Sequence, residues 1–274
     1  ERLPQDETPE FARNMANRLW AMMMGRGIVH PLDMHHSANP PSHPELLSAL
    51  GQNLAASKYD IKSFLRGVCL SNTYQRSSLI PNKAIAEQLP ADSFAVANMK
   101  GLSPEQLFES LLVSTQARAL LEKQIDDAIA EESAATTEAN AEAEKSDDDK
   151  TKEERNKHRS AKVAEFVTVF GSVPGQPEGE FAASLPQALF LANSETVSDW
   201  VPAGSGNLTE RLVEMDDPAA IAEELFLSVL SRIPEAEETQ LVMEQLGSSD
   251  ADRPKTVAAL VWSLLASAEF RLNH

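Results

Sequence analysis

Helix-start signals recur along the chain, and they constrain its fold more than any other feature. Each start has a Ser, Thr or Asp that can cap a first turn, followed within two residues by a proline, which helices accept in their first turn. Apolar residues then follow at helical spacing. The starts are Thr8-Pro9-Glu10, Ser42-His43-Pro44-Glu45, Ser103-Pro104-Glu105, Ser184-Leu185-Pro186, Asp217-Pro218 and Asp252-Arg253-Pro254. Helices this short bury their apolar faces only against each other, so we predict an all-α fold, an irregular multi-helix bundle.

Two stretches depart from this helical pattern. Residues 163–170, VAEFVTVF, are β-like in composition. Residues 131–160 are acidic and low in complexity, and between Asp126 and Arg155 the chain has twelve acidic and four basic side chains. Such a stretch cannot bury enough surface to offset its chain entropy, so we predict a long disordered insertion, an acidic loop or linker. It separates an N-terminal helical half, 1–130, from a C-terminal half, 161–274, and we expect the halves to share one core.

Composition excludes several classes of function. The net charge of −18 repels nucleic acid. No apolar run is long enough for a membrane-spanning helix, so we expect no membrane insertion. The single cysteine, Cys69, rules out an internal disulfide, and no haem-attachment or paired-cysteine zinc motif is present, so we expect no cofactor. The chain begins without methionine, and we expect it to be a piece of a longer protein.

The stretch from residue 25 to 47, GRGIVHPLDMHHSANPPSHPELL, leaves three interpretations open. Its prolines exclude a helix from 27 to 41 and favour a stiff connector, in which Asp33 could pair with Arg18 or Arg26. A hydrolase-type enzyme could instead use Asp33 and His43 in a cleft. A metal site would need imidazoles that converge through loop geometry. The candidate ligands are His30, His35, His36 and His43.

Four pieces of the first 80 residues carry a family resemblance: NRLWAMMMGRGIV, NPPSHPELL, YDIKSFLR and SNTYQRSS. Together they resemble a domain of unknown function found in large planctomycete proteins. SLPQALFLANS, ELFLSVLSRIPEAEETQLVMEQL and LLASAEFRLNH are similar to later helices of that family, with Ser231 in place of its usual glycine. One departure is that Met34 follows Asp33 where the family often has two adjacent acids.

The resemblance implies a setting but no activity. In that family the domain lies C-terminal to another uncharacterised domain, often with a cytochrome-c-like domain upstream, in exported proteins. It therefore implies an extracytoplasmic location, periplasmic or at the cell surface, with partners among the parent protein's other domains or envelope proteins. We predict a non-catalytic helical interaction or structural module. Its binding or motif cluster is predicted to comprise Asn17, Arg18, Trp20, Arg26, Asp33, Asn39 and His43.

Overall fold

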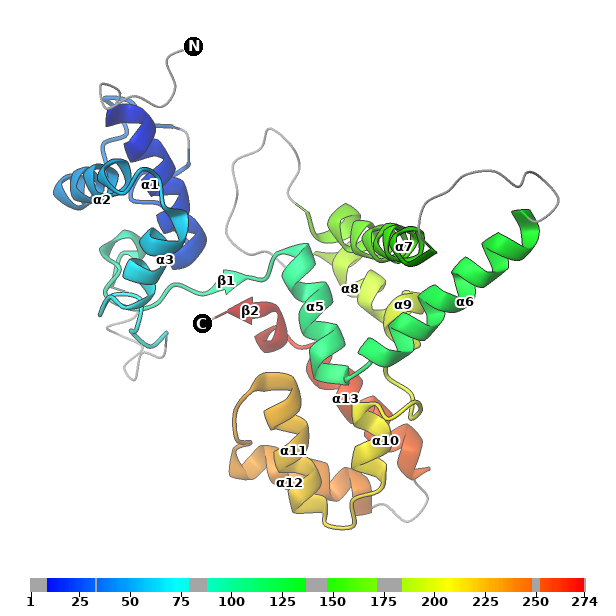
Figure 1. Ribbon diagram of the computed structural model, residues 1–274. Coiled ribbons are helices and arrows are strands. Elements are labelled where there is room, and N and C mark those ends of the chain that lie inside the picture. The colour runs from blue at the N-terminus through cyan, green and yellow to red at the C-terminus, as the bar shows by residue number, and fades with distance from the viewer. Residues whose placement is uncertain are drawn as a thin grey trace. The chain divides into compact units, whose positions relative to one another are not determined.

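The computed structural model describes residues 9–32, 34–78, 88–136, 147–171, 184–247 and 252–273 (Figure 1). These residues form α-helices and connections, with one two-residue antiparallel pair, β1 (Lys100–Gly101) and β2 (Leu272–Asn273). The predicted all-α fold is therefore confirmed. The chain divides into two compact units. The first ends at Gly101 and also includes β2, and the second begins at Leu102, whereas the sequence predicts a boundary near residue 130.

The first unit is built on three helices, α1 (Pro9–Met24), α2 (Pro44–Ala56) and α3 (Ile61–Cys69), followed by the short 3-10 turn η1 (Ala91–Ser93). The helix α1 contacts both α2 and α3. Its buried face contributes four of the eleven buried residues of the unit's own hydrophobic core, and the others include Leu54, Phe64 and Phe94.

The second unit has its own, larger core, formed by residues from α5 through η2. The described part of this unit contains the α-helices α5 (Pro104–Thr115), α6 (Arg118–Thr136), α7 (Asp147–Phe170), α8 (Leu185–Asn193), α9 (Glu195–Ser198), α10 (Leu208–Val213), α11 (Pro218–Leu230), α12 (Ala236–Gly247) and α13 (Arg253–Leu265). It ends with the 3-10 turn η2 (Glu269–Arg271). Trp200 and Phe108 are the largest side chains buried in it, and their rings lie 5.6 Å apart.

Three of the six predicted helix starts have the expected caps, whereas Asp252 makes no side-chain cap hydrogen bond and Thr8 lies outside the described residues. Ser103 and Ser184 each accept a hydrogen bond from the backbone N–H three residues later, and both form complete capping boxes. Asp217 accepts from the Ala219 N–H at the start of α11. Ser42 differs, because α2 begins one residue later, with His43 at the N-cap position. The Ser42 hydroxyl instead donates to the Ile28 carbonyl, 3.1 Å away, so it ties the preceding connector to α2.

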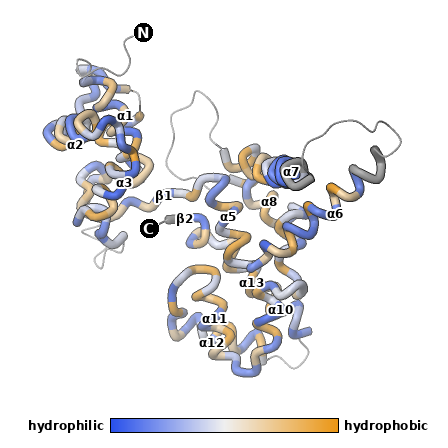
Figure 2. Tube along the Cα trace, viewed as in Figure 1, coloured by the Kyte–Doolittle hydropathy of each residue, from blue (hydrophilic) through white to orange (hydrophobic). Residues whose placement is uncertain are grey.

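The β-like run at residues 163–170 is helical and forms the end of α7. Figure 2 shows α7 changing from hydrophilic to hydrophobic along its length. Phe166 and Phe170, four residues apart, lie on one face of this helix, and both contact Phe190 of α8. Burial of that face outweighs the β preference of the local sequence, because Phe166 is fully buried.

The acidic stretch predicted to be a disordered insertion is helical at both of its ends. Residues up to Thr136 continue α6, and α7 starts at Asp147; residues 137–146 lie outside the described residues. Ala, Glu, Lys and Arg are strong helix formers. Arg155 of α7 also donates two hydrogen bonds to the carboxylate of Asp126 on α6, at 2.7 and 2.8 Å. This ion pair joins α7, which has six acidic and six basic side chains, to the more acidic α6.

Arg232 joins three elements of the second unit. Its guanidinium donates to both carboxylate oxygens of Glu238 in α12, at 2.7 and 2.8 Å, and to Glu269 in η2, at 2.6 and 3.0 Å. It also lies 5.1 Å from the centre of the Phe226 ring of α11. The preceding Ser231 has a φ of +57°, a left-handed conformation that ends α11 and favours glycine. The geometry explains why the resembled family usually has glycine there.

The Arg232 contacts predict an acid-sensitive contribution to stability. Hydrogen bonds from Arg232 hold the pKa of Glu238 below its ordinary value. The stabilisation is therefore present above the unfolded-state pKa, about 4.3, and is lost as the pH falls through the lower folded-state pKa. Because Glu238 is one-third exposed, we expect no more than about 1 kcal/mol. Between pH 6 and 3, the melting temperature of Glu238→Gln should fall less than that of wild type.

Glu237→Gln is the matched control for this measurement. Glu237 is the exposed neighbour of Glu238 in the first turn of α12. Its variant should follow the wild-type melting curve across the whole pH range. If the melting temperature falls equally with pH in wild type and in both variants, the Arg232 contacts do not contribute to acid unfolding.

Candidate functional site

The connector between α1 and α2 is held by the side chain of Asn17, which lies in α1. The Asn17 amide donates to the Val29 carbonyl and accepts from the Val29 N–H, each over 2.9 Å. Asn17 is buried, so these two bonds replace the water that Val29 would otherwise bind. Next to this pair, Gly27 has no room for a side chain, because a Cβ there would lie 2.4 Å from the Val29 carbonyl oxygen.

A second amide side chain holds the outer part of the same connector. Asn39 donates to the Met34 carbonyl at 2.8 Å, and its backbone N–H donates to the His36 carbonyl at 2.9 Å. At the connector's end, the backbone N–H of Ser42 donates to the Ile28 carbonyl, 2.9 Å away. Backbone groups are thus the main partners of both asparagines, as expected of a structural connector.

The histidines of this connector are not grouped as metal ligands. His35 and His36 are exposed, and the Nδ1 atom of His36 accepts from the Ala38 N–H, 3.2 Å away. Among the residues that the structure describes, no three His, Cys, Asp or Glu side chains lie close enough to hold a metal ion. The proposed ligand set of His30, His35, His36 and His43 is therefore not assembled in the described part of the connector.

Two of the predicted motif residues meet at Phe94. The Trp20 ring contacts Phe94 edge-on, with ring centres 5.3 Å apart, and the His43 ring lies 5.7 Å from Phe94 on a tilted plane. The Nδ1 atom of His43 is 3.1 Å from the Ser42 hydroxyl. These contacts place His43 against the core of the first unit, where it helps to position the start of α2.

The other predicted residues are distributed around the connector. Arg18 is exposed on α1, and Arg26 is half-buried just after that helix. Asp33 lies outside the described residues, so its predicted pairing with Arg18 or Arg26, or with His43 in catalysis, stays a prediction. Of the described members of the cluster, Asn17 and Asn39 bind the backbone of the connector.

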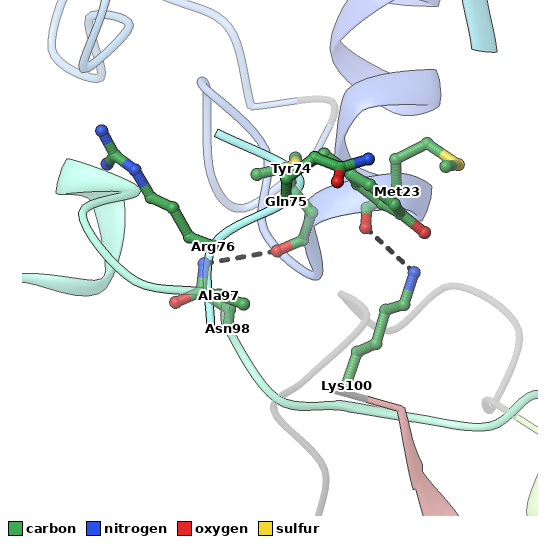
Figure 3. A pocket seen from close by; sticks show the side chains of 8 residues that line it. Met23, Tyr74, Gln75, Arg76, Ala97, Asn98 and Lys100 are labelled. Carbon is green, nitrogen blue, oxygen red and sulfur yellow. Dashed lines mark hydrogen bonds between the residues drawn. The ribbon is translucent and has the colours of Figure 1, made fainter. Parts of the chain in front are cut away.

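A cavity of about 320 Å³ lies beside the C-terminal end of α1 (Figure 3). Its volume is at the lower end of the range for small-ligand sites. It is lined by residues from the end of α1, from the segment after α3 and from the segment leading into β1: Met23, Met24, Tyr74, Gln75, Arg76, Ala97, Asn98 and Lys100. Two of the pieces that carry the family resemblance, residues 17–29 and 71–78, therefore meet at this cavity.

Lys100 reaches from β1 to the end of α1, as Figure 3 shows. Its ammonium group donates to the carbonyls of Met22 and Met23, each at 2.9 Å. These carbonyls are at the negative end of the helix dipole, which favours a cation. Burial lowers the pKa of Lys100, and only the Cys69 thiol opposes that shift. The side chain thus closes one wall of the cavity with a partly desolvated positive charge.

Exposed apolar side chains adjoin the cavity in sequence. Met22 precedes two lining residues, Met99 lies between two others, and Leu70 follows Cys69, whose carbonyl accepts from Gln75 of the wall. Their exposed fractions are 69%, 64% and 68%, among the largest of the described apolar residues. We call these three residues the apolar rim, a name that rests on their exposure and on their position in the sequence next to the cavity wall.

Charge is distributed unevenly along the chain. Residues 1–101 contain ten basic and nine acidic side chains, which gives a net charge of +1. Residues 102–274 contain 14 basic and 33 acidic side chains, which gives a net charge of −19. Among the residues that the structure describes, no acidic side chain lines the cavity. The overall charge of the chain therefore does not describe the surface that surrounds this cavity.

Sequence reasoning did not identify the cavity. Its wall joins residues that are more than 70 positions apart, such as Met23 and Lys100. The available signals were the methionine run at 22–24, interpreted as core filling, and the TYQR piece at 73–76. Met24 is buried, as core filling predicts, whereas Met22 is exposed on the surface. The methionine run therefore contributes both to the core and to the surface.

Comparison with known proteins gives one match. The family model PSD1, described as a protein of unknown function (DUF1553), matches residues 1–246. Neither the curated proteins nor the solved structures include a match to the chain. In the part of the chain that the structure describes, no helix has both the length and the apolar character needed to cross a membrane.

Proposed function

The chain belongs to the PSD1 family of proteins of unknown function, and we propose that it acts there as a non-catalytic helical module that binds other proteins. The observation that carries this proposal is the cavity at the end of α1 with its apolar rim of Met22, Leu70 and Met99. Exposed apolar side chains near a cavity are typical of an interaction site, and these three are close in sequence to residues of the cavity wall. Methionine side chains are flexible and adapt to partners of different shape.

The arrangement of the predicted motif residues supports a structural rather than a catalytic role for the connector. Asn17 binds the backbone of Val29, and Asn39 binds the backbone at Met34. His43 packs against Phe94. In this proposal the connector is a rigid support that fixes α1, and the C-terminal end of α1 then presents Met23 at the cavity.

We further propose an extracytoplasmic setting, as one part of a longer envelope protein of planctomycete type. Its partners would be other domains of that protein or other envelope proteins. The support for this setting is the resemblance of residues 17–29, 39–47, 59–66 and 71–78 to a domain of exported proteins. Fold alone does not supply a function, so the binding site needs a direct test.

Site-specific photo-crosslinking in the producing organism tests the proposed module. Met22→p-benzoylphenylalanine places a crosslinker on the apolar rim, and Val113→p-benzoylphenylalanine places one on α5, where Val113 is 64% exposed. We expect a discrete crosslinked product from position 22 that excess unmodified chain suppresses, and none from position 113. Identical product patterns from the two positions would overturn the proposal.

A further inference from the structure

Lys100 is a cation without a carboxylate partner among the described residues. Lysine has three N–H donors, and two of them bind the Met22 and Met23 carbonyls. Burial of a charge without a counter-charge is costly, and the chain has 42 acidic residues that could have supplied one. The third N–H donor of Lys100 has no hydrogen-bond partner in the described part of the chain and is open to solvent or to a ligand in the cavity.

The hydroxyl of Tyr74 adds a second donor to the cavity wall. Tyr74 is half-buried, and its hydroxyl has no hydrogen-bond partner within the described residues. By contrast, the amide nitrogens of Gln75 and Asn98 already donate to backbone carbonyls. Arg76 extends away from Lys100 in Figure 3, and its guanidinium donates to the Phe94 carbonyl at 2.6 Å. Lys100 and Tyr74 are thus the wall's donors for an acceptor in the cavity.

The positive charge of Lys100 and the apolar rim together indicate which class of ligand the cavity can bind. A cavity with free donors and no acidic lining residue accepts a carboxylate better than an amine or a neutral amide. The apolar rim of Met22, Leu70 and Met99 favours apolar neighbours of that carboxylate. A peptide in which acidic and apolar side chains alternate satisfies both requirements, and its negative charge complements the described part of the first unit. There, eight Lys and Arg side chains outnumber four Asp and Glu.

We propose that the cavity binds an acidic peptide segment of a partner protein, with one carboxylate of that segment accepting hydrogen bonds from Lys100 and Tyr74. The apolar rim contacts the side chains next to this carboxylate. This inference rests on the proposed function, because it assigns a class of partner to the same surface. The proposed ligand is anionic although the chain has a net charge of −18. Net charge alone would favour cations and basic surfaces as partners.

Fluorescence polarisation with the full chain tests this inference. The probe is a fluorescein-labelled peptide of sequence ELEDLE, and its neutral counterpart is QLQNLQ. We expect a dissociation constant on the order of 10–100 µM for the acidic peptide, at least about tenfold tighter than for the neutral one. Binding should weaken as salt is raised, because charge attraction is screened. Equal affinity for the two peptides, or no binding of ELEDLE, would overturn the inference.

Variants locate the binding to this cavity. Lys100→Met keeps the aliphatic stem and should weaken binding of ELEDLE about tenfold, whereas Lys62→Met removes an exposed lysine of α3 and should leave it unchanged. Tyr74→Phe removes only the hydroxyl, so its melting temperature should equal that of wild type while binding weakens about fivefold. This second variant keeps the test valid if Lys100→Met loosens the end of α1. Wild-type affinity in both cavity variants would contradict the site.

The peptide and crosslinking results separate the two proposals. If position 22 crosslinks to a specific protein but ELEDLE does not bind, the interaction module stands and the acidic ligand is wrong. If neither experiment shows binding, both proposals are wrong. Binding of ELEDLE that is lost in Lys100→Met and Tyr74→Phe, together with a specific crosslink at position 22, supports both.

Discussion

Replacement of Asn17 by alanine is expected to lower the free energy of unfolding of the first unit by about 2–4 kcal/mol. Asn17 is 6% exposed and supplies both hydrogen-bond partners of Val29. The variant leaves a buried N–H and a buried C=O without partners, and each such group costs about 1–3 kcal/mol. Val29 itself is 2% exposed, so water cannot readily replace the lost amide.

Hydrogen exchange measured by mass spectrometry is the suitable probe for Asn17→Ala, because it resolves the first unit from the second. Peptides covering residues 9–56 should exchange about 30-fold faster or more in native buffer. Asn14→Ala is the matched control, since Asn14 lies on the same helix and is exposed; its exchange should match wild type. Wild-type protection in Asn17→Ala would show that the connector is held by other contacts.

Local signals in the sequence predict the helices well. The hydroxyl caps at Ser103 and Ser184 and the carboxylate cap at Asp217 act within three residues of their partners. Such contacts depend on local geometry that residue type and spacing define. The same holds for the connector after α1, where prolines and Gly27 exclude a helix. Fold class and most helix starts could therefore be read from the sequence.

Features that depend on distant residues could not be read in the same way. Residues 163–170 have β-branched and aromatic side chains, but Phe166 packs against Phe108, a residue 58 positions earlier, and this contact favours the helix. Lys100 binds the carbonyls of Met22 and Met23 across more than 75 positions. No periodicity or motif encodes such pairs. The cavity depends on the second pair, so the sequence did not predict it.

Phe166→Ala is the second prediction with a large expected effect, and it concerns the helix that follows the acidic stretch. Phe166 is fully buried, and its ring centre lies 5.3 Å from that of Phe108 and 5.0 Å from that of Phe190. Removal of a buried phenylalanine costs about 3–5 kcal/mol, because burial is lost and a cavity remains. Alanine favours helix more than phenylalanine does, so the loss reports packing and not local helix propensity.

Urea unfolding followed by tryptophan fluorescence measures this loss, since Trp200 is fully buried beside Phe108. We expect the urea midpoint for Phe166→Ala to fall by about 1–5 M, given a urea slope of roughly 1–3 kcal/mol/M. Val167→Ala is the control on the next residue of α7, where the side chain is 42% exposed; it should cost less than about 1 kcal/mol. Similar midpoints for the two variants would mean that α7 does not belong to the cooperative core. A selective loss in Phe166→Ala would show that the polar start of α7 continues into a helix required by the second unit's fold.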